Sequence, residues 1–168
     1  NLSLPANQST LTNDDCVSRQ NNFFRLSPFA IRLNMYYESI KVLDCTIRDG
    51  GLVNKHDFSL EFVRRLYTLL SAAGIDYMEM GYKNSPELFD PKEYGPWKFC
   101  DDDLLWKVKD GIESKMKMAV MADVGRVNMD AVKPASESPY QMFRVASYVK
   151  NIDKGISMVN AFHDMGYE

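Results

Sequence analysis

Two adjacent charged residues, Arg48 and Asp49, directly precede the glycine pair at positions 50–51. The residues before them, 40–46, are apolar and β-branched, which predicts a short buried parallel strand. Both side chains would then lie at the carboxyl end of that strand, where parallel α/β folds place their reacting groups. A carboxylate there can hold a divalent cation through oxygen, and a guanidinium beside it can bind a carboxylate or stabilise an enolate oxygen. A structural ion pair followed by a turn glycine is the equally supported alternative.

An acidic residue, Glu79, interrupts the otherwise apolar segment 75–80, which predicts the next strand. A lone buried charge is costly, so Glu79 needs a partner of opposite charge. Arg48 on the neighbouring strand is the natural one. This pairing favours a chemical site over a chance combination of residues.

Several more polar residues end or follow the predicted strands. Asp123 ends the strand predicted over 117–123, and it either lines the same pocket or caps the helix that follows. Tyr82 and Asn84 lie in the long loop after the second strand, where they either contact a substrate or serve as ordinary loop residues. Arg126 has the chemistry to bind an anionic group.

The predicted elements alternate between strand and helix. Leu60, Val63 and Leu66 recur at helical spacing. Ser59 can cap the start of this helix, and Gly74 stands where it would stop. Strands are predicted over 40–46, 75–80, 117–123 and 142–147, and helices over 60–73, 101–113, 128–133 and 152–165.

This order calls for a parallel sheet with right-handed crossovers, built either as a doubly wound open sheet or as a closed barrel. No G-x-G-x-x-G follows the first strand, so the dinucleotide-binding version of the open sheet loses its main support. A complete (β/α)8 TIM barrel takes about 250 residues. The four β/α units therefore predict that residues 35–168 form the N-terminal half of such a barrel.

The composition is that of an ordinary globular protein, with 45% hydrophobic residues, 26% charged residues and a formal net charge of −3. The acidic balance and the scattered basic residues argue against a nucleic-acid partner. No run of about 18 apolar residues is present, so we expect no membrane-spanning helix. Three widely spaced cysteines predict reduced thiols and a cytoplasmic location.

Residues 1–34 differ from the rest of the chain because they are rich in Asn, Ser, Gln and Thr and show no sustained helix or strand period. The pattern sharpens directly after Met35. The favoured interpretation is a natural start at Met35, with residues 1–34 as an extension upstream of it. The alternative is a flexible N-terminal arm.

The run DCTIRDG at positions 44–50 resembles the D-x-T-L-R-D-G signature of the DRE-TIM metallolyases. This superfamily includes hydroxymethylglutaryl-CoA lyase, 4-hydroxy-2-oxovalerate aldolase, and the isopropylmalate and homocitrate synthases. The Asp-Arg-Glu triplet that names it would correspond to Asp49, Arg48 and Glu79. The run FRVA, which contains Arg144, is similar to the fourth strand of the aldolase branch, and Arg144 is assigned to the substrate pocket on that basis.

The resemblance implies a divalent metal, Mg²⁺ or Mn²⁺, that is bound by Asp49 and by two histidines of an H-x-H on the seventh strand. The metal would chelate the oxo and carboxylate oxygens of a 2-oxo acid. Arg48 would stabilise the enolate that forms when a carbon–carbon bond to an aldehyde or acyl partner breaks or forms. This chain has no H-x-H, since His56 and His163 are isolated, so the remaining metal ligands are expected outside it.

A second departure concerns the general base. The oxovalerate aldolases carry a catalytic histidine three residues after the signature aspartate, where this chain has Leu52. His56, four residues further on, is the candidate replacement, and an exposed loop histidine is the alternative. His163 on the last predicted helix is expected to serve the helix surface or its packing.

These observations predict an aldolase, a metal-dependent carbon–carbon lyase that acts on a 2-oxo acid, with little activity in these 168 residues alone. The rival hypothesis is a non-catalytic module on the same barrel that keeps Arg48 and binds a carboxylate or a phosphate. A third possibility is a half-barrel that pairs with a second copy, which makes a homo-oligomer possible.

Overall fold

The computed structural model describes residues 39–168. The start at Met35 and the extension over residues 1–34 lie outside this range, so both stay predictions. Lys41–Glu168 forms one compact unit.

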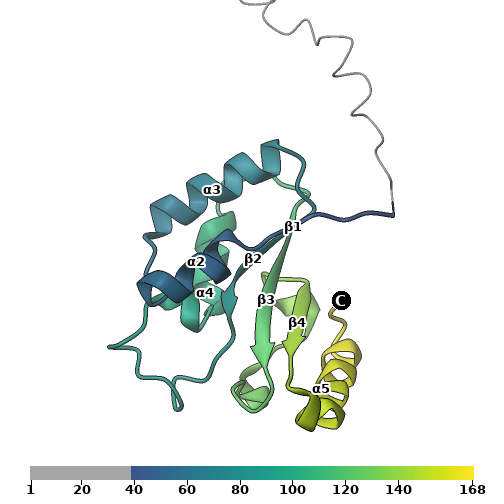
Figure 1. Cartoon of the computed structure of the whole chain (residues 1–168). Helices are drawn as coiled ribbons and strands as arrows, with labels where there is room; N and C mark the ends of the chain where they lie inside the picture. The colour runs from purple at the N-terminus through teal and green to yellow at the C-terminus, as the bar shows by residue number, and fades with distance from the viewer. Residues whose placement is uncertain (1–38) are drawn as a thin grey trace, which may run out of the picture. The chain divides into compact units, whose positions relative to one another are not determined.

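A four-stranded parallel sheet organises this unit (Figure 1), with the strands in the order β1-β2-β3-β4. The strands are β1 (Leu43–Asp44), β2 (Tyr77–Tyr82), β3 (Lys117–Asp123) and β4 (Met142–Ala146). Each strand pairs with its neighbour in the sequence. Doubly wound sheets instead reverse their strand order at a switch point. The described strands therefore follow the order that a barrel requires.

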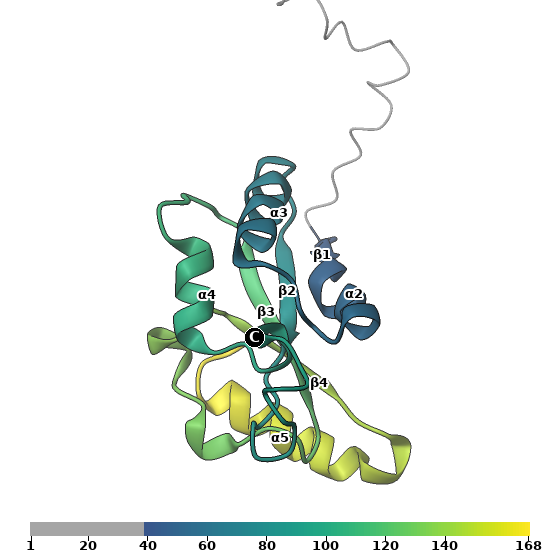
Figure 2. The ribbon, with the colours of Figure 1, turned by 90° about the vertical axis from the view of Figure 1, so that its left-hand side faces the viewer.

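Four α-helices accompany the sheet: α2 (Thr46–Asn54), α3 (Leu60–Ala72), α4 (Asp102–Lys109) and α5 (Ile152–Asp164). Figures 1 and 2 show α3 and α4 side by side next to β2 and β3, with α5 next to β4. The short helix predicted over 128–133 is present only as the three-residue 3₁₀ helix Met129–Ala131, and a second 3₁₀ helix, Ala135–Glu137, follows it in the crossover from β3 to β4. Val132, directly after the first 3₁₀ helix, is extended, and Pro134, two residues further on, has no N–H to donate to a helical hydrogen bond. The helix therefore cannot continue.

The strand predicted over 40–46 is longer than the observed strand β1, which ends at Asp44. The Asp44 carboxylate accepts hydrogen bonds from the backbone N–H and the hydroxyl of Thr46 at 3.1 and 2.8 Å. The Asp49 N–H then donates to the Cys45 carbonyl at 2.8 Å, which starts α2. Arg48 and Asp49 therefore lie in the first turn of a helix, not at the end of a strand.

The two faces of the sheet differ in chemistry. One face carries apolar side chains, and the Phe143 ring of β4 stacks on Phe162 of α5 at 3.7 Å between ring centroids. The other face carries Glu79 and Arg144. Glu79 is in register with Ala119 of β3, and Arg144 is in register with Met121 of β3. Ala119 and Met121 are two residues apart, so their side chains lie on the same face. Alternation along each strand thus separates a helix-covered core from a polar face.

The chain after α5 runs beside the free edge of β4. The Glu168 N–H donates to the Gln141 carbonyl at 2.9 Å, and the Phe143 N–H donates to the Glu168 carbonyl at 3.1 Å. This is the pattern of a parallel ladder. The Glu168 carboxylate also accepts a hydrogen bond from the Tyr77 hydroxyl at 2.6 Å and pairs with Lys117.

The predicted limits of α3 are confirmed to within one residue. The Ser59 hydroxyl accepts a hydrogen bond from the Phe62 N–H at 3.2 Å, and Gly74 takes the left-handed conformation just past the end of the helix. Among residues 39–168, no helix has both the length and the apolar character needed to cross a membrane.

A long-range cap joins α3 to α4. The Arg64 guanidinium donates to the carbonyls of Lys107, Val108 and Asp110 at the end of α4. Replacing Arg64 by methionine is expected to lower the free energy of unfolding by about 1.5 kcal/mol, because these carbonyls lose a charged donor. Urea denaturation followed by circular dichroism measures the change. The exposed neighbour Arg65, changed to methionine, is the control, and equal losses in both variants would contradict the cap.

Candidate functional site

The centre of the site is the Glu79 carboxylate, which is fully buried on β2. Its Oε2 accepts hydrogen bonds from Arg48 Nε at 2.7 Å and from an Arg144 terminal nitrogen at 2.8 Å. Its Oε1 has no hydrogen-bond partner among the described residues. The predicted pairing of Glu79 with Arg48 is present, and Arg144 from β4 joins it. One carboxylate thus orients two guanidinium groups toward one another.

Arg48 stays charged in this position. Burial lowers its pKa, but the hydrogen bond and the charge of Glu79, followed by the charge of Asp49, raise that pKa above its ordinary value. The Tyr82 side chain also acts to raise this pKa, as the smallest of these causes. A guanidinium with its position set by two carboxylates is suited to hold a planar anion or a developing oxyanion.

An irregularity in β2 brings Tyr82 into the site. The register between β2 and β3 shifts between Glu79 and Tyr82, so Tyr82 lies opposite Met121 on the Glu79 face. Without the shift, strand alternation would turn the Tyr82 ring to the opposite face. The shift requires glycine at position 81. Its φ of +150° is rarely adopted by residues with a side chain, and a β-carbon there would overlap the Trp97 carbonyl oxygen.

His56 is buried, so the alternative of an exposed loop histidine is wrong. Only 2% of the residue is exposed, and its left-handed backbone (φ +62°) turns the ring toward Gly51 and the Tyr82 ring, 5.3 Å away between centroids. Burial, followed by the charges of Lys98 and Arg48, lowers the pKa of His56 to about 4. The imidazole is therefore neutral at pH 7, and its Nδ1 has no hydrogen-bond partner among residues 39–168. Leu52, at the position of the family's histidine, is 63% exposed.

Lys98 is a site residue that the sequence did not indicate. It ends the 3₁₀ helix Pro96–Lys98 and is only 7% exposed. Its ammonium lies over three aromatic rings, those of Tyr82, Phe89 and Tyr94, at 4.7, 4.6 and 5.2 Å from their centroids. No local motif marks such a cage, because the loop brings its rings together from separate positions.

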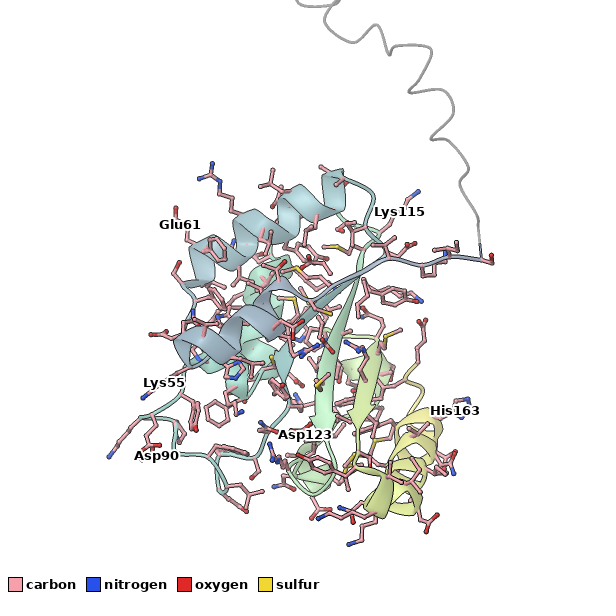
Figure 3. The ribbon with its side chains drawn as sticks, in the orientation of Figure 1. Lys55, Glu61, Asp90, Lys115, Asp123 and His163 are labelled. Carbon is pink, nitrogen blue, oxygen red and sulfur yellow. The ribbon has the colours of Figure 1, made fainter. Side chains whose placement is uncertain are left out.

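Asp123 lies at the carboxyl end of β3 (Figure 3) and forms an ion pair with Arg126 at 3.0 Å. Both residues line a small cavity of about 290 Å³ at the ends of β3 and β4, together with Ser147 and Tyr148. Arg48, Glu79 and Arg144 do not line this cavity, so the place of Asp123 in their pocket stays a prediction. His163 is exposed on α5, away from Asp123 (Figure 3).

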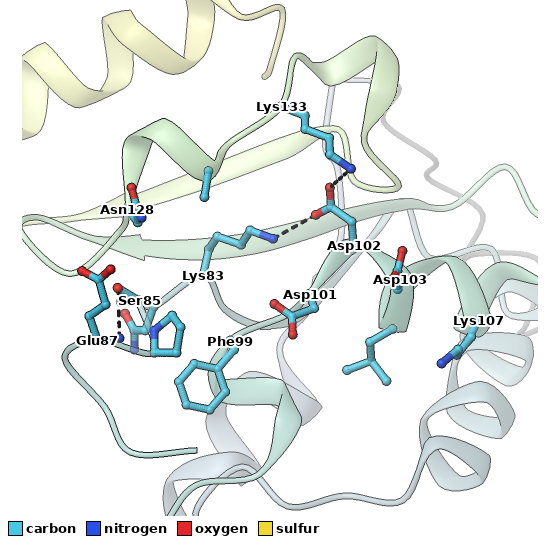
Figure 4. A pocket seen from close by; sticks show the side chains of 14 residues that line it. Lys83, Ser85, Glu87, Phe99, Asp101, Asp102, Asp103, Lys107, Asn128 and Lys133 are labelled. Carbon is cyan, nitrogen blue, oxygen red and sulfur yellow. Dashed lines mark hydrogen bonds and ion pairs between the residues drawn. The ribbon is translucent and has the colours of Figure 1, made fainter. Parts of the chain in front are cut away.

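Asn84 lines a different and larger pocket of about 560 Å³, next to the start of α4 (Figure 4). Both polar atoms of its buried amide lack a hydrogen-bond partner within the described residues. The carboxylate of Asp102 in this pocket is already held by Lys83 at 2.9 Å and Lys133 at 3.6 Å. Arg48, Glu79 and Arg144 are not part of its lining. We place the functional site at Glu79 because the charged side chains of Arg48 and Arg144 gather there.

Asp49 can contribute to a metal site but cannot complete one. Its side chain is 57% exposed and pairs with Arg48. Across residues 39–168, no group of three or more His, Cys, Asp or Glu is arranged to hold a metal ion. A carboxylate oxygen is the hard donor that Mg²⁺ and Mn²⁺ prefer, so Asp49 fits as one ligand. The metal remains a prediction.

Curated relatives of this chain carry one name. The chain is 26% identical to 4-hydroxy-2-oxovalerate aldolase of Moorella thermoacetica over 132 residues, and 23% identical to 4-hydroxy-2-oxovalerate aldolase 6 of Rhodococcus jostii over 133 residues. These matches cover 79% and 78% of the chain. They span only 38% and 36% of the two relatives' own lengths. No family model matches the chain.

A solved structure supports the same relationship. The fold matches a crystal structure of the N-terminal domain of a candidate aldolase from Bacteroides vulgatus with a TM-score of 0.59 and 28% sequence identity. The match covers 77% of this chain and 42% of the other. The α/β fold with its parallel four-stranded sheet therefore matches the N-terminal domain of this candidate aldolase.

Proposed function

We propose that this chain, whose homologues are 4-hydroxy-2-oxovalerate aldolases of the DRE-TIM family, contributes the substrate-binding half of a carbon–carbon lyase that acts on a 2-oxo acid. The observation that carries the proposal is the Glu79 carboxylate with Arg48 and Arg144 on either side. The sequential parallel strand order supports a (β/α)8 barrel as the complete fold.

The two guanidinium groups have different tasks in this proposal. The Arg144 side chain is 38% exposed and binds the carboxylate of the 2-oxo acid. The Arg48 side chain, 15% exposed, lies deeper and stabilises the enolate oxygen that forms as the carbon–carbon bond breaks. Asp49 would hold Mg²⁺ or Mn²⁺ together with ligands beyond the described residues. When bound, the metal supplies Lewis-acid polarisation of the oxo group.

His56 is the base in this scheme. In the cleavage direction it takes the proton of the substrate hydroxyl, the carbon–carbon bond breaks, and the electron pair moves to the enolate. A base must be unprotonated at working pH, and burial keeps the imidazole neutral. Tyr82, whose ring contacts His56 at 5.3 Å between centroids, positions the imidazole.

Asp49→Asn, made in the protein that contains this chain with its complete barrel, is expected to lower kcat with pyruvate, an aldehyde and Mn²⁺ by at least about 100-fold. A coupled turnover assay measures the loss. Asp164→Asn at the exposed end of α5 is the matched control. Undiminished turnover in Asp49→Asn would contradict the metal-ligand assignment.

Leu52 favours one rival function, a non-catalytic carboxylate-binding module. An exposed leucine at the position of the family's histidine cannot accept a proton. In that case the complete protein binds pyruvate through Arg144 but gives no turnover with any aldehyde at saturating Mn²⁺. Loss of pyruvate binding in Arg144→Gln is expected under both functions, whereas turnover occurs only under the first.

A further inference from the structure

We propose that Lys98 forms a second anion-binding position in the site, which selects an aldehyde or acyl partner carrying its own carboxylate or phosphate group. The inference rests on the proposed function, because it assigns a chemical class to the second reactant. It starts from the one lysine of the described chain whose ammonium is caged by three aromatic rings.

The charge of Lys98 is not compensated by protein groups. Within residues 39–168, no carboxylate lies within ion-pair distance of its ammonium, although the residue is only 7% exposed. Aromatic rings stabilise a cation but do not neutralise it. A buried charge normally has a partner, so this ammonium lacks the counter-charge that an anionic ligand would supply.

The position of Lys98 is fixed by the loop around it. The neighbouring Trp97 donates its indole N–H to the Phe58 carbonyl at 2.8 Å. The Gly95 N–H donates to the Lys55 carbonyl at 2.9 Å, and a β-carbon on Gly95 would overlap the backbone of His56. The loop is thus joined to the connection between α2 and α3, which holds the ammonium in place before any ligand arrives.

Lys98 lies between the Glu79 group and the carboxyl end of β3. It shares the Tyr82 ring with His56, and it shares the Phe89 ring with Arg126, whose guanidinium is 5.7 Å from the ring centroid. Asp123, the acid whose charge acts on Lys98, already pairs with Arg126. Burial and the charge of Arg126 lower the pKa of Lys98, and the charge of Asp123 opposes them.

This arrangement divides the work between two positions. Arg48 and Arg144 share Glu79 and hold the 2-oxo acid, whereas Lys98 has no ion pair among the described residues and the nearby Asp123 pairs with Arg126. An anionic tail on the second reactant would restore the balance of charge at Lys98. A neutral aldehyde would leave the ammonium uncompensated, so the site discriminates against it.

Nuclear magnetic resonance titration of the 168-residue chain tests the proposal. The probes are three alcohols that cannot react with amines: 4-hydroxybutyrate, glycerol 3-phosphate and 1-propanol. We expect at least one anionic probe to bind 10-fold or more tightly than 1-propanol, and Lys98→Met to remove that preference. Lys98→Arg, which keeps the charge, is expected to retain it, and Lys92→Met in the same loop is the matched control. The preferred anion shows whether the tail is a carboxylate or a phosphate.

The outcomes below decide the question, and the amide spectrum of each variant reports whether it is folded. Equal binding of all three probes, or an unchanged preference in folded Lys98→Met, overturns the inference. If Lys98→Met unfolds, Lys98→Arg decides: retained preference supports the inference, and lost preference in a folded protein overturns it. Pyruvate is titrated in parallel against Arg144→Gln. Absent pyruvate binding with intact Lys98-dependent binding contradicts the proposed function and leaves the anion position standing.

Discussion

Glu79→Gln is expected to lower the free energy of unfolding by about 3 kcal/mol, one of the two largest effects of a single change in this fold. The carboxylate is fully buried, and Arg48 and Arg144 both donate to its Oε2. Glutamine has nearly the same shape but no charge, so the variant leaves two guanidinium groups close together without their shared counter-charge. Urea denaturation at pH 7 measures the loss.

The control for this change is Glu87→Gln, an exposed glutamate of the β2–α4 loop, which is expected to shift stability by less than about 0.5 kcal/mol. Adding Arg144→Gln to Glu79→Gln removes one of the two cations that shared Glu79, so the double variant is expected to regain part of the loss. If Glu79→Gln unfolds at the same urea concentration as the wild type, the carboxylate does not hold the two arginines together in solution.

Gly81→Ala is expected to cost about 3 kcal/mol or more. Its φ of +150° is a conformation that side chains rarely adopt, and the new methyl group would overlap the Trp97 carbonyl oxygen. That carbonyl is backbone, so it cannot move aside as a flexible side chain would. The variant must therefore lose either the register shift between β2 and β3 or the close contact between Gly81 and Trp97. If the register shift is lost, Tyr82 leaves the Glu79 face of the sheet.

Gly74→Ala separates strain from overlap, because Gly74 also has a positive φ, +79°, but a methyl group added there would meet no atom within 4 Å. We expect it to cost about 1 kcal/mol. Denaturant midpoints of both variants give the comparison, and the quenching of Trp97 fluorescence reports on the loop. Equal costs in the two glycine variants would show that overlap with Trp97 contributes nothing.

Periodicity predicted β3 and α3 because their patterns are local. The strand over 117–123 is β3 with the same limits, and the helix over 60–73 differs from α3 by one residue. Residues 46–54 form a helix that the sequence did not predict. Two adjacent glycines disfavour a helix there, and packing on β2 overrides that local preference.

The pairing of charges in the site was predictable from the sequence, whereas the positions of the side chains that depend on irregular backbone were not. Charge pairing alone led from Glu79 to Arg48, since a buried carboxylate needs a cation. The burial of His56 depends on two left-handed residues after α2, and the position of Tyr82 depends on a one-residue shift at Gly81. Lys98 depends on a loop conformation. None of these three features has a period that could be detected in the sequence.

The strand order has a consequence for how the chain is made. Each strand pairs with the one synthesised just before it, and Glu168 continues the series beside β4. During synthesis from the N-terminus, each new strand can therefore pair with a strand that has already left the ribosome. β1 contributes only two residues to the ladder, so the first long strand available for pairing is β2. The candidate site assembles in the same order, with Arg48 made first, Glu79 second, and Arg144 completing the charge cluster as β4 is added.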